Sequence, residues 1–237
     1  MTKRYWWVVI SYVIMQFSVI LGAPLFYFLF KLTEAEAIIY FTIFSFLAGL
    51  VVFLLLMKPD MKEGVSPDAS ATGTTVGWII GGVFMALAAQ ALAANIEIHV
   101  FGIKTESENT KNIMDISKAF PIFYVIPVLI APILEEILFR KIIFGALYNR
   151  TNFWIAALIS SVIFAVIHQD PKHILVYASM GLTFAFLYVK TKRIIVPILV
   201  HMGMNTTAVL GQLLLTPEKM EKLEQQMNFI QQQIIGG

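Results

Sequence analysis

The chain contains no cysteine and few charged residues. The absence of cysteine excludes disulfide bonds and thiolate zinc sites. Charged residues make up 14% of the 237 residues, whereas hydrophobic residues make up 58%. An ordinary soluble domain has about 25% charged and about 45–50% apolar residues, so this composition predicts a polytopic membrane protein. The formal net charge of +2 is too small to indicate a nucleic-acid partner, and we expect none.

Seven apolar segments are candidates for crossing a membrane, which takes about 20 apolar residues per helix. They cover residues 6–30, 36–57, 76–101, 121–147, 153–168, 174–189 and 194–215. The first run reaches Phe30 without a small-residue cleavage site, so it predicts a retained span rather than a signal peptide. The expected fold class is all-α: a polytopic transmembrane helical bundle forming one membrane-embedded domain, residues 1–237, with seven spans.

Local patterns add detail to this organisation. Thr33-Glu34-Ala35-Glu36 is a capping box and predicts the start of the second span. Gly77 and Gly81 have the spacing that lets membrane helices approach closely, although ordinary glycine usage explains it equally well. Residues 105–118 predict a short interfacial helix. The tail, residues 216–237, predicts an amphipathic helix, interfacial or packed on a partner, with a frayed helix as the alternative.

The distribution of Lys and Arg predicts a cytoplasmic N-terminus. With the N-terminus inside, inner segments hold nine of these residues and outer segments hold seven, leaving Arg140 aside. The cluster at 190–193 is the strongest single element of this bias. We therefore expect a multi-pass protein of the cell membrane, in contact with the lipid bilayer. His99 and His173 end apolar segments, and we expect both at the membrane interface.

Two adjacent carboxylates, Glu135 and Glu136, lie inside an apolar stretch. A charge at bilayer depth costs about 3 kcal/mol or more, so such residues face a protein interior or a polar cavity. Neighbouring helical side chains point about 100° apart, and Glu136 can pair with Arg140 four positions later. Glu135 is then free for chemistry, whereas a purely stabilising ion pair would leave one carboxylate uncompensated. Pro132 predicts a kink just before the pair.

His168, His201 and Asn205 share this apolar environment, and the last two lie on one helix face. A carboxylate and an imidazole can deprotonate a water that attacks a carbonyl, while an imidazole and a carboxamide can bind the resulting oxyanion. Alternatively, Glu135, His168 and His201 could ligate a divalent metal such as zinc. The signature His-Glu-x-x-His of soluble metalloproteases is absent. Both mechanisms stay open at this point.

Three short motifs lie in the segment that carries these residues, the core at about 120–215. They are Glu135-Glu136-x-x-x-Arg140, Phe164-x-x-x-His168 and His201-x-x-x-Asn205. In kind and order they resemble the motifs of the CAAX protease and bacteriocin-processing family, also called Abi proteins. The first 120 residues carry little specific resemblance. The resemblance implies an intramembrane endopeptidase similar to the type II CAAX prenyl endopeptidases, and eight spans as an alternative to seven.

The same resemblance implies roles for the motif residues. Glu135 and His168 would activate the water, and His201 and Asn205 would form the oxyanion site. The remaining motif residues would have supporting roles: Glu136, Arg140 and Phe164. Because asparagine is a poor zinc ligand, the residues favour a glutamate-dependent enzyme over a metallo-endopeptidase. A simple alternating topology puts His168 and His201 toward opposite membrane faces, so the fifth span must tilt or stay short.

The family resemblance leaves the substrate and the activity open. The expected partner is a peptide or membrane-protein substrate, prenylated or not. The alternative function is a non-proteolytic membrane scaffold or regulator with the same fold. A third hypothesis for the function is a proton-coupled transporter, since intramembrane carboxylates and histidines also form proton relays.

Overall fold

The computed structural model describes residues 1–103 and 107–214, and all regular structure in these two ranges is helical. The amphipathic helix expected at 216–237 lies outside the described residues. The elements follow in chain order: α1 (Lys3–Phe17), α2 (Val19–Phe30), α3 (Glu34–Glu63), α4 (Thr72–His99), α5 (Glu108–Ala119), the 3₁₀ turn η1 (Pro121–Tyr124), the π-helix η2 (Ile126–Ile130), α6 (Ala131–Glu136), the π-helix η3 (Ile137–Phe144), α7 (Gly145–Tyr148), α8 (Phe153–Ile167), the 3₁₀ turn η4 (Pro171–His173), α9 (Ile174–Thr191) and α10 (Ile195–Leu214).

Helices occupy all seven apolar segments that the sequence singled out, so the all-α prediction is confirmed. Within the described residues, four helices are long and apolar enough to cross a membrane: Glu34–Glu63, Thr72–His99, Pro121–Tyr148 and Pro171–Thr191. The pair α1 and α2, bent by 50°, makes a fifth if it counts as one span. The chain is thus a multi-pass membrane protein, and seven or eight crossings stay a prediction.

Helix ends follow the expected local chemistry. The Thr33 side chain accepts a hydrogen bond from the Glu36 backbone, and the Glu36 carboxylate accepts one from the Thr33 backbone, so the predicted capping box is confirmed. The short helix expected at 105–118 is α5, capped by the Ser107 side chain. Its position relative to a membrane interface stays a prediction.

The segment that carries the two carboxylates has an irregular backbone. It runs from η1 through η2, α6 and η3 to α7, so wide π-helical turns flank the α-helical residues 131–136 on both sides. Pro127 and Pro132 lack the N–H that an α-helical turn requires, which explains why regular hydrogen bonding fails there. The kink predicted at Pro132 stays a prediction, and the structure shows widened turns on both sides of it, which are frequent at functional sites.

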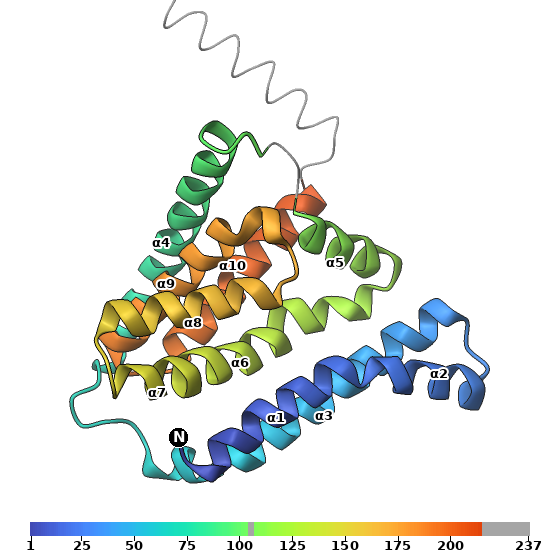
Figure 1. Cartoon of the computed structure of the whole chain (residues 1–237), viewed down its shortest axis with the longest axis horizontal. Coiled ribbons are helices and arrows are strands. Elements are labelled where there is room, and N and C mark those ends of the chain that lie inside the picture. Colours follow the sequence, from blue (N-terminus) through green and yellow to red (C-terminus); the bar gives the residue numbers. More distant parts are fainter. Residues whose placement is uncertain (104–106, 215–237) are drawn as a thin grey trace, which may run out of the picture.

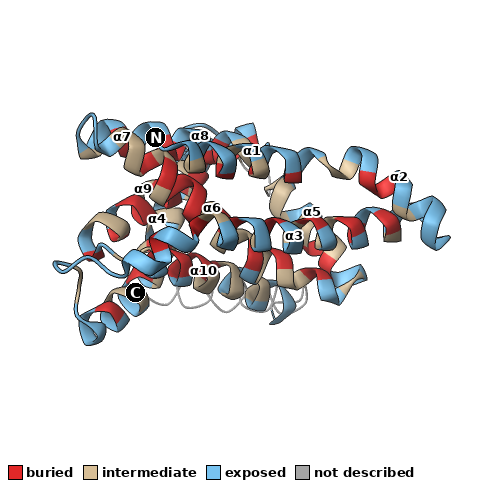
Figure 2. Cartoon of the chain, turned by 90° about the horizontal axis from the view of Figure 1, so that it is seen from below, coloured by how far each residue is buried: buried red, intermediate tan, exposed pale blue. Residues whose placement is uncertain are grey.

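The helices pack in two connected groups (Figure 1). In the first, α9 lies against α4, α8 and α10, and α10 also contacts α6. In the second, α3 pairs with α1 and α2 and touches η2 and α6. Buried residues gather where α6, α9 and α10 meet, whereas α2 is exposed along most of its length (Figure 2). The interior of the first group is where the motif residues come together.

Glycines allow the tightest helix contacts. A Cβ added at Gly181 of α9 would lie 2.7 Å from the Ser161 side chain and 2.9 Å from its Cα, so α8 and α9 pack almost backbone to backbone. Of the two explanations for Gly77 and Gly81, ordinary glycine usage fits the described chain, because a Cβ added at either meets nothing within 4 Å. The glycine of α4 that meets a neighbouring helix is Gly82, where an added Cβ would lie 2.7 Å from the Val200 side chain.

A buried carboxylate fixes η3 at one end of the bundle. Asp60 of α3 contacts the Arg4 guanidinium at 2.5 Å, accepts a hydrogen bond from the Tyr5 hydroxyl at 2.5 Å, and lies 3.3 Å from Lys141 Nζ. This cluster ties α1 and α3 to the segment that carries the motif glutamates.

Candidate functional site

The two motif glutamates occupy different environments at the end of α6. The Glu136 side chain is completely buried, and its Oε2 lies 2.9 Å from Nε of the equally buried Arg140. The Glu135 side chain keeps 13% of its surface exposed. The predicted pairing of Glu136 with Arg140 is therefore present, and Glu135 is the less buried of the two carboxylates.

Arg140 is held by aromatic rings as well as by Glu136. Its guanidinium carbon lies 4.7 Å from the ring centre of Phe164, 5.5 Å from that of Phe184 and 5.9 Å from that of Phe139. Such cation–π contacts strengthen when water is excluded, which compensates part of the cost of burying the charge. Phe164 thus has a supporting contact, and Phe184 is a residue that the sequence reasoning missed.

His201 lies between the two carboxylates. Its Nδ1 is 3.0 Å from Glu136 Oε1, and its Nε2 is 3.9 Å from Glu135 Oε2. The ring stacks on Phe184 at a centroid distance of 4.8 Å. Glu136 therefore contacts both Arg140 and His201. The other ring nitrogen of His201, Nε2, points toward Glu135 at a distance longer than a hydrogen bond.

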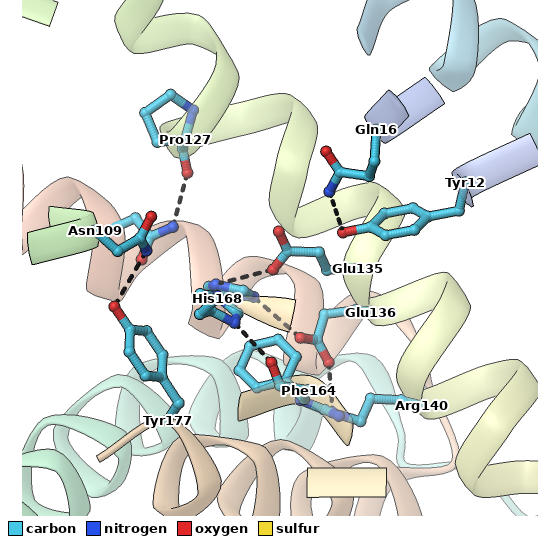
Figure 3. A network of polar contacts seen from close by, with 12 residues as sticks. Tyr12, Gln16, Asn109, Pro127, Glu135, Glu136, Arg140, Phe164, His168 and Tyr177 are labelled. Atoms are coloured by element: carbon cyan, nitrogen blue, oxygen red, sulfur yellow. Dashed lines mark hydrogen bonds and ion pairs between the residues drawn. The ribbon is translucent and has the colours of Figure 1, made fainter. Parts of the chain in front are cut away.

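His168 is fixed by its own helix and by α9. Its Nδ1 is 2.7 Å from the Phe164 carbonyl oxygen, and its ring stacks on Tyr177 at 4.3 Å. A carbonyl oxygen only accepts, so we assign the Nδ1 proton to this bond, which makes Nε2 the acceptor of the neutral ring. Figure 3 shows His168 in the same region as Glu135, with its hydrogen bond to the Phe164 carbonyl oxygen.

Phe164 brings the two histidines to the same region. Its ring centre lies 4.5 Å from that of His168 and 6.0 Å from that of His201. The fifth candidate span is short, which is one of the two arrangements that the topology requires, since α8 has 15 residues. It is about 22 Å long at 1.5 Å per residue, less than the roughly 30 Å of a hydrocarbon core, and its placement in a membrane stays a prediction.

Asn205 contacts the irregular backbone ahead of α6. Its Nδ2 donates to the Pro127 carbonyl oxygen at 2.7 Å. In a π-helical turn that carbonyl would accept from the residue five positions later, but this is Pro132, which has no N–H. The Asn205 amide takes the place of the missing donor and keeps a second N–H on the same nitrogen. The π-helical turn before α6 is thereby tied to α10.

The candidate metal ligands do not form a metal-binding group. Over residues 1–103 and 107–214, no three His, Asp or Glu side chains are placed so that they could hold an ion together. Glu135, His168 and His201 thus do not fit a three-ligand site as they are arranged, and we derive no step through a metal. The zinc alternative stays a prediction for experiment.

Other polar residues beside the site were missed. The Tyr177 hydroxyl lies 3.0 Å from Ser107 Oγ and accepts from Asn109 Nδ2 at 3.1 Å, so α5 is tied to the ring that stacks on His168. On α1, Gln16 donates to the Tyr12 hydroxyl at 3.0 Å, and Figure 3 shows this pair next to Glu135. Polar side chains four apart in an apolar helix were the available signal for the α1 pair.

The fold and these side chains together describe an all-helical membrane protein whose interior carries two glutamates and two histidines from three helical segments. A family model described as "Type II CAAX prenyl endopeptidase Rce1-like" matches residues 117–207. The chain belongs to this family of CAAX proteases, as its three motifs indicated.

Two curated relatives cover most of the chain. It is 46% identical to "Putative membrane peptidase YdiL" of Bacillus subtilis (strain 168), over 100% of this chain and 99% of the relative. It is 34% identical to "Membrane-embedded CAAX protease MroQ" of Staphylococcus aureus (strain USA300), over 84% of this chain and 83% of the relative. No solved structure matches the chain.

Proposed function

We propose that the protein is an intramembrane endopeptidase that hydrolyses a peptide bond with a water activated by Glu135 and His168. The observation that carries this proposal is the position of Glu135, the partly exposed carboxylate beside an otherwise buried row of Glu136, Arg140 and His201. Membership of a CAAX protease family and relatives named as a peptidase and a protease support the reaction class.

The first step is proton transfer from water. Glu135 accepts the proton while Nε2 of His168 holds the water by its second hydrogen, which leaves the oxygen free to attack the scissile carbonyl. The C–O bond forms, and the carbonyl electrons move to oxygen to give a tetrahedral oxyanion. Collapse of this intermediate breaks the C–N bond, and Glu135 returns its proton to the leaving amine. Proton and electron counts balance without a cofactor.

The second element is stabilisation of the oxyanion. In this proposal His201 carries protons on both nitrogens, so that Nδ1–H donates to Glu136 and Nε2–H to the oxyanion. The second donor is the remaining N–H of Asn205, on the same face of α10. Glu136 fixes the His201 ring through Nδ1, in the way that a carboxylate orients a catalytic imidazole in other hydrolases. Arg140 pairs with Glu136 and lies against the Phe164 ring, and the Phe164 ring in turn contacts the His201 ring.

The substrate of this proposal is a peptide or a segment of a membrane protein that reaches Glu135 from within the bilayer. We include seven crossings, a polar cavity around Glu135 and a cytoplasmic N-terminus in the same proposal. The support for the topology is that Arg4 and Lys141, both assigned to inner segments, lie together on Asp60 at one end of the bundle.

The test is cleavage of a peptide library by purified protein in liposomes, read by mass spectrometry. Wild type is compared with Glu135→Ala and His168→Ala, and Glu34→Ala on the exposed start of α3 is the control. We expect cleavage by wild type and control, and loss of about 10²-fold or more in both site variants. If no peptide is cleaved, or if both variants cleave at the wild-type rate, the proposal fails. Retention of partner binding without cleavage would instead identify a scaffold or regulator.

A further inference from the structure

A second carboxylate–imidazole pair lies inside the bundle, outside the family motifs. Glu97, near the end of α4, is 2% exposed, and its Oε2 lies 2.8 Å from Nδ1 of His173, which is 9% exposed. His173 is therefore packed inside the protein, whereas His99, two positions after Glu97, is exposed, and the position of both relative to a membrane interface stays a prediction. The sequence did not single out Glu97 because it is the only acidic residue of α4 and ends an apolar run.

Glu97 also acts as the cap of α9. Its Oε1 accepts a hydrogen bond from the Val176 backbone N–H at 3.2 Å. Val176 is the third residue of α9, the position whose N–H a capping side chain satisfies. Side-chain caps come from the residue before a helix, but His173 at that position makes no capping bond, and a carboxylate from α4 supplies it instead. A negative charge there also complements the helix dipole.

The segment between α8 and α9 depends on this carboxylate. The turn carries Gln169 with a left-handed backbone, at φ 53°. Asp170 Oδ2 and His173 Nε2 are buried and make no hydrogen bond within the described residues. Within the turn, backbone hydrogen bonds run from Gln169 N to the Val166 carbonyl at 3.1 Å and from His173 N to the Asp170 carbonyl at 3.0 Å. Lys172 adds an exposed contact with Glu108 of α5 at 3.7 Å, whereas Glu97, which contacts both His173 and Val176, is the buried side chain that joins this turn to α4.

This anchored turn joins two residues of the candidate site. His168 ends α8 immediately before it, and Tyr177 follows Val176 on α9 and stacks on the His168 ring at 4.3 Å. A shift or rotation of the first turn of α9 would move Tyr177 away from the imidazole. Because His168 keeps one hydrogen bond, to the Phe164 carbonyl, loss of the stacking ring would leave its Nε2 poorly directed.

We propose that Glu97 and His173 are positioning residues that hold the first turn of α9, and with it Tyr177, so that the His168 ring is fixed in its orientation. Neither residue touches the reacting atoms. The effect of these two residues on turnover rests on the proposed peptidase function. Their effect on the orientation of the His168 ring does not depend on that function.

The test begins with a readout that needs no activity. Protein labelled with ¹⁵N and ¹³C at histidine gives signals from four residues only, and His168→Ala assigns the one of interest. In Glu97→Gln and His173→Gln we expect the ring signals of His168 to shift or broaden as Tyr177 moves, while those of His99 stay in place. Glu34→Gln is the matched control, since Glu34 is exposed at the start of α3, away from this turn. Unchanged His168 signals in folded Glu97→Gln and His173→Gln would overturn the proposal.

Kinetics then separate positioning from plain structural support. We expect Glu97→Gln to lower kcat by about 10- to 100-fold with KM changed less than about threefold, since a small misplacement of a catalytic group has an effect of this size. In a Tyr177→Leu background, the same substitution should have little further effect, because both act through His168. Additive losses would contradict the proposal. If wild type cleaves no peptide, the peptidase function fails, and the histidine signals still decide the positioning role.

Discussion

Nδ1 of His201 lies 3.0 Å from Oε1 of Glu136, joining two residues 65 positions apart in the chain. This contact gives Glu136 two partners, because its other oxygen faces Arg140. Glu136 therefore connects α6, η3 and α10 through its side chain. The Glu135 side chain lies beside these contacts and is 13% exposed.

The two glutamates should differ in what their loss does to stability. Glu136→Gln leaves the buried Arg140 guanidinium without its counter-charge, and breaking a buried pair in this way costs about 3–5 kcal/mol. Glu135→Gln removes a partly exposed carboxylate that lies 3.9 Å from His201 Nε2, beyond hydrogen-bond distance. Thermal unfolding in detergent should show a large drop in Tm for Glu136→Gln and little change for Glu135→Gln. Equal drops in Tm for the two variants would contradict the stabilising role of Glu136.

The aromatic contacts of Arg140 predict that lysine cannot replace it. Arg140→Lys keeps the charge but loses the planar group that faces three rings, and the ammonium is more strongly hydrated. We expect a loss of about 1–2 kcal/mol in stability, measured as a shift in the unfolding midpoint. Arg150→Lys is the control, because Arg150 is exposed. A stability of Arg140→Lys equal to that of wild type would show that charge alone matters.

The packing of α8 on α9 predicts a steric effect at Gly181. An added Cβ there would lie 2.7 Å from the Ser161 side chain, so Gly181→Ala must push the two helices apart. Overpacking of this kind costs about 1–3 kcal/mol. At Gly211 of α10 a Cβ meets nothing within 4 Å, so Gly211→Ala should be neutral. Protease resistance of the two variants gives the comparison, and equal resistance would refute tight packing at Gly181.

Contacts between neighbours on one helix were predictable, and contacts between helices were not. The pairing of Glu136 with Arg140 follows from a spacing of four, which brings side chains together on any helical backbone. The bond from Glu136 to His201 depends on how α6 and α10 are rotated about their axes, which no local pattern fixes. The same reason explains why the Glu97–His173 pair was missed and why the sequence could not decide whether Gly77 and Gly81 make close helix contacts.

The absence of cysteine makes the topology directly testable. Val65 and Val100 lie beyond opposite ends of α4 and are 53% and 69% exposed. With a cytoplasmic N-terminus and α1–α2 as one span, Val100→Cys should react with a membrane-impermeant maleimide in intact cells. Val65→Cys should react only after permeabilisation. The reverse labelling pattern would mean that α1 and α2 together do not cross the membrane, or that the N-terminus lies outside.

The choice between a glutamate-dependent and a metal-dependent enzyme is a separate prediction. We expect cleavage to survive dialysis against EDTA, with a change of less than about twofold, since the described donors do not form a three-ligand group. A zinc peptidase treated in parallel controls for effective chelation. Loss of activity that added zinc restores would show that Glu135, His168 and His201 rearrange to bind a metal.

The most direct measurement of the central claim is the initial cleavage rate of Glu135→Gln in liposomes, on the best peptide found with wild type. Glutamine keeps the size of the side chain and one acceptor oxygen but cannot take up the proton of water. We expect a fall of about 10²–10⁴-fold in kcat with normal folding and a KM close to that of wild type. A Glu135→Gln enzyme that cleaves at the wild-type rate would show that Glu135 is not the base.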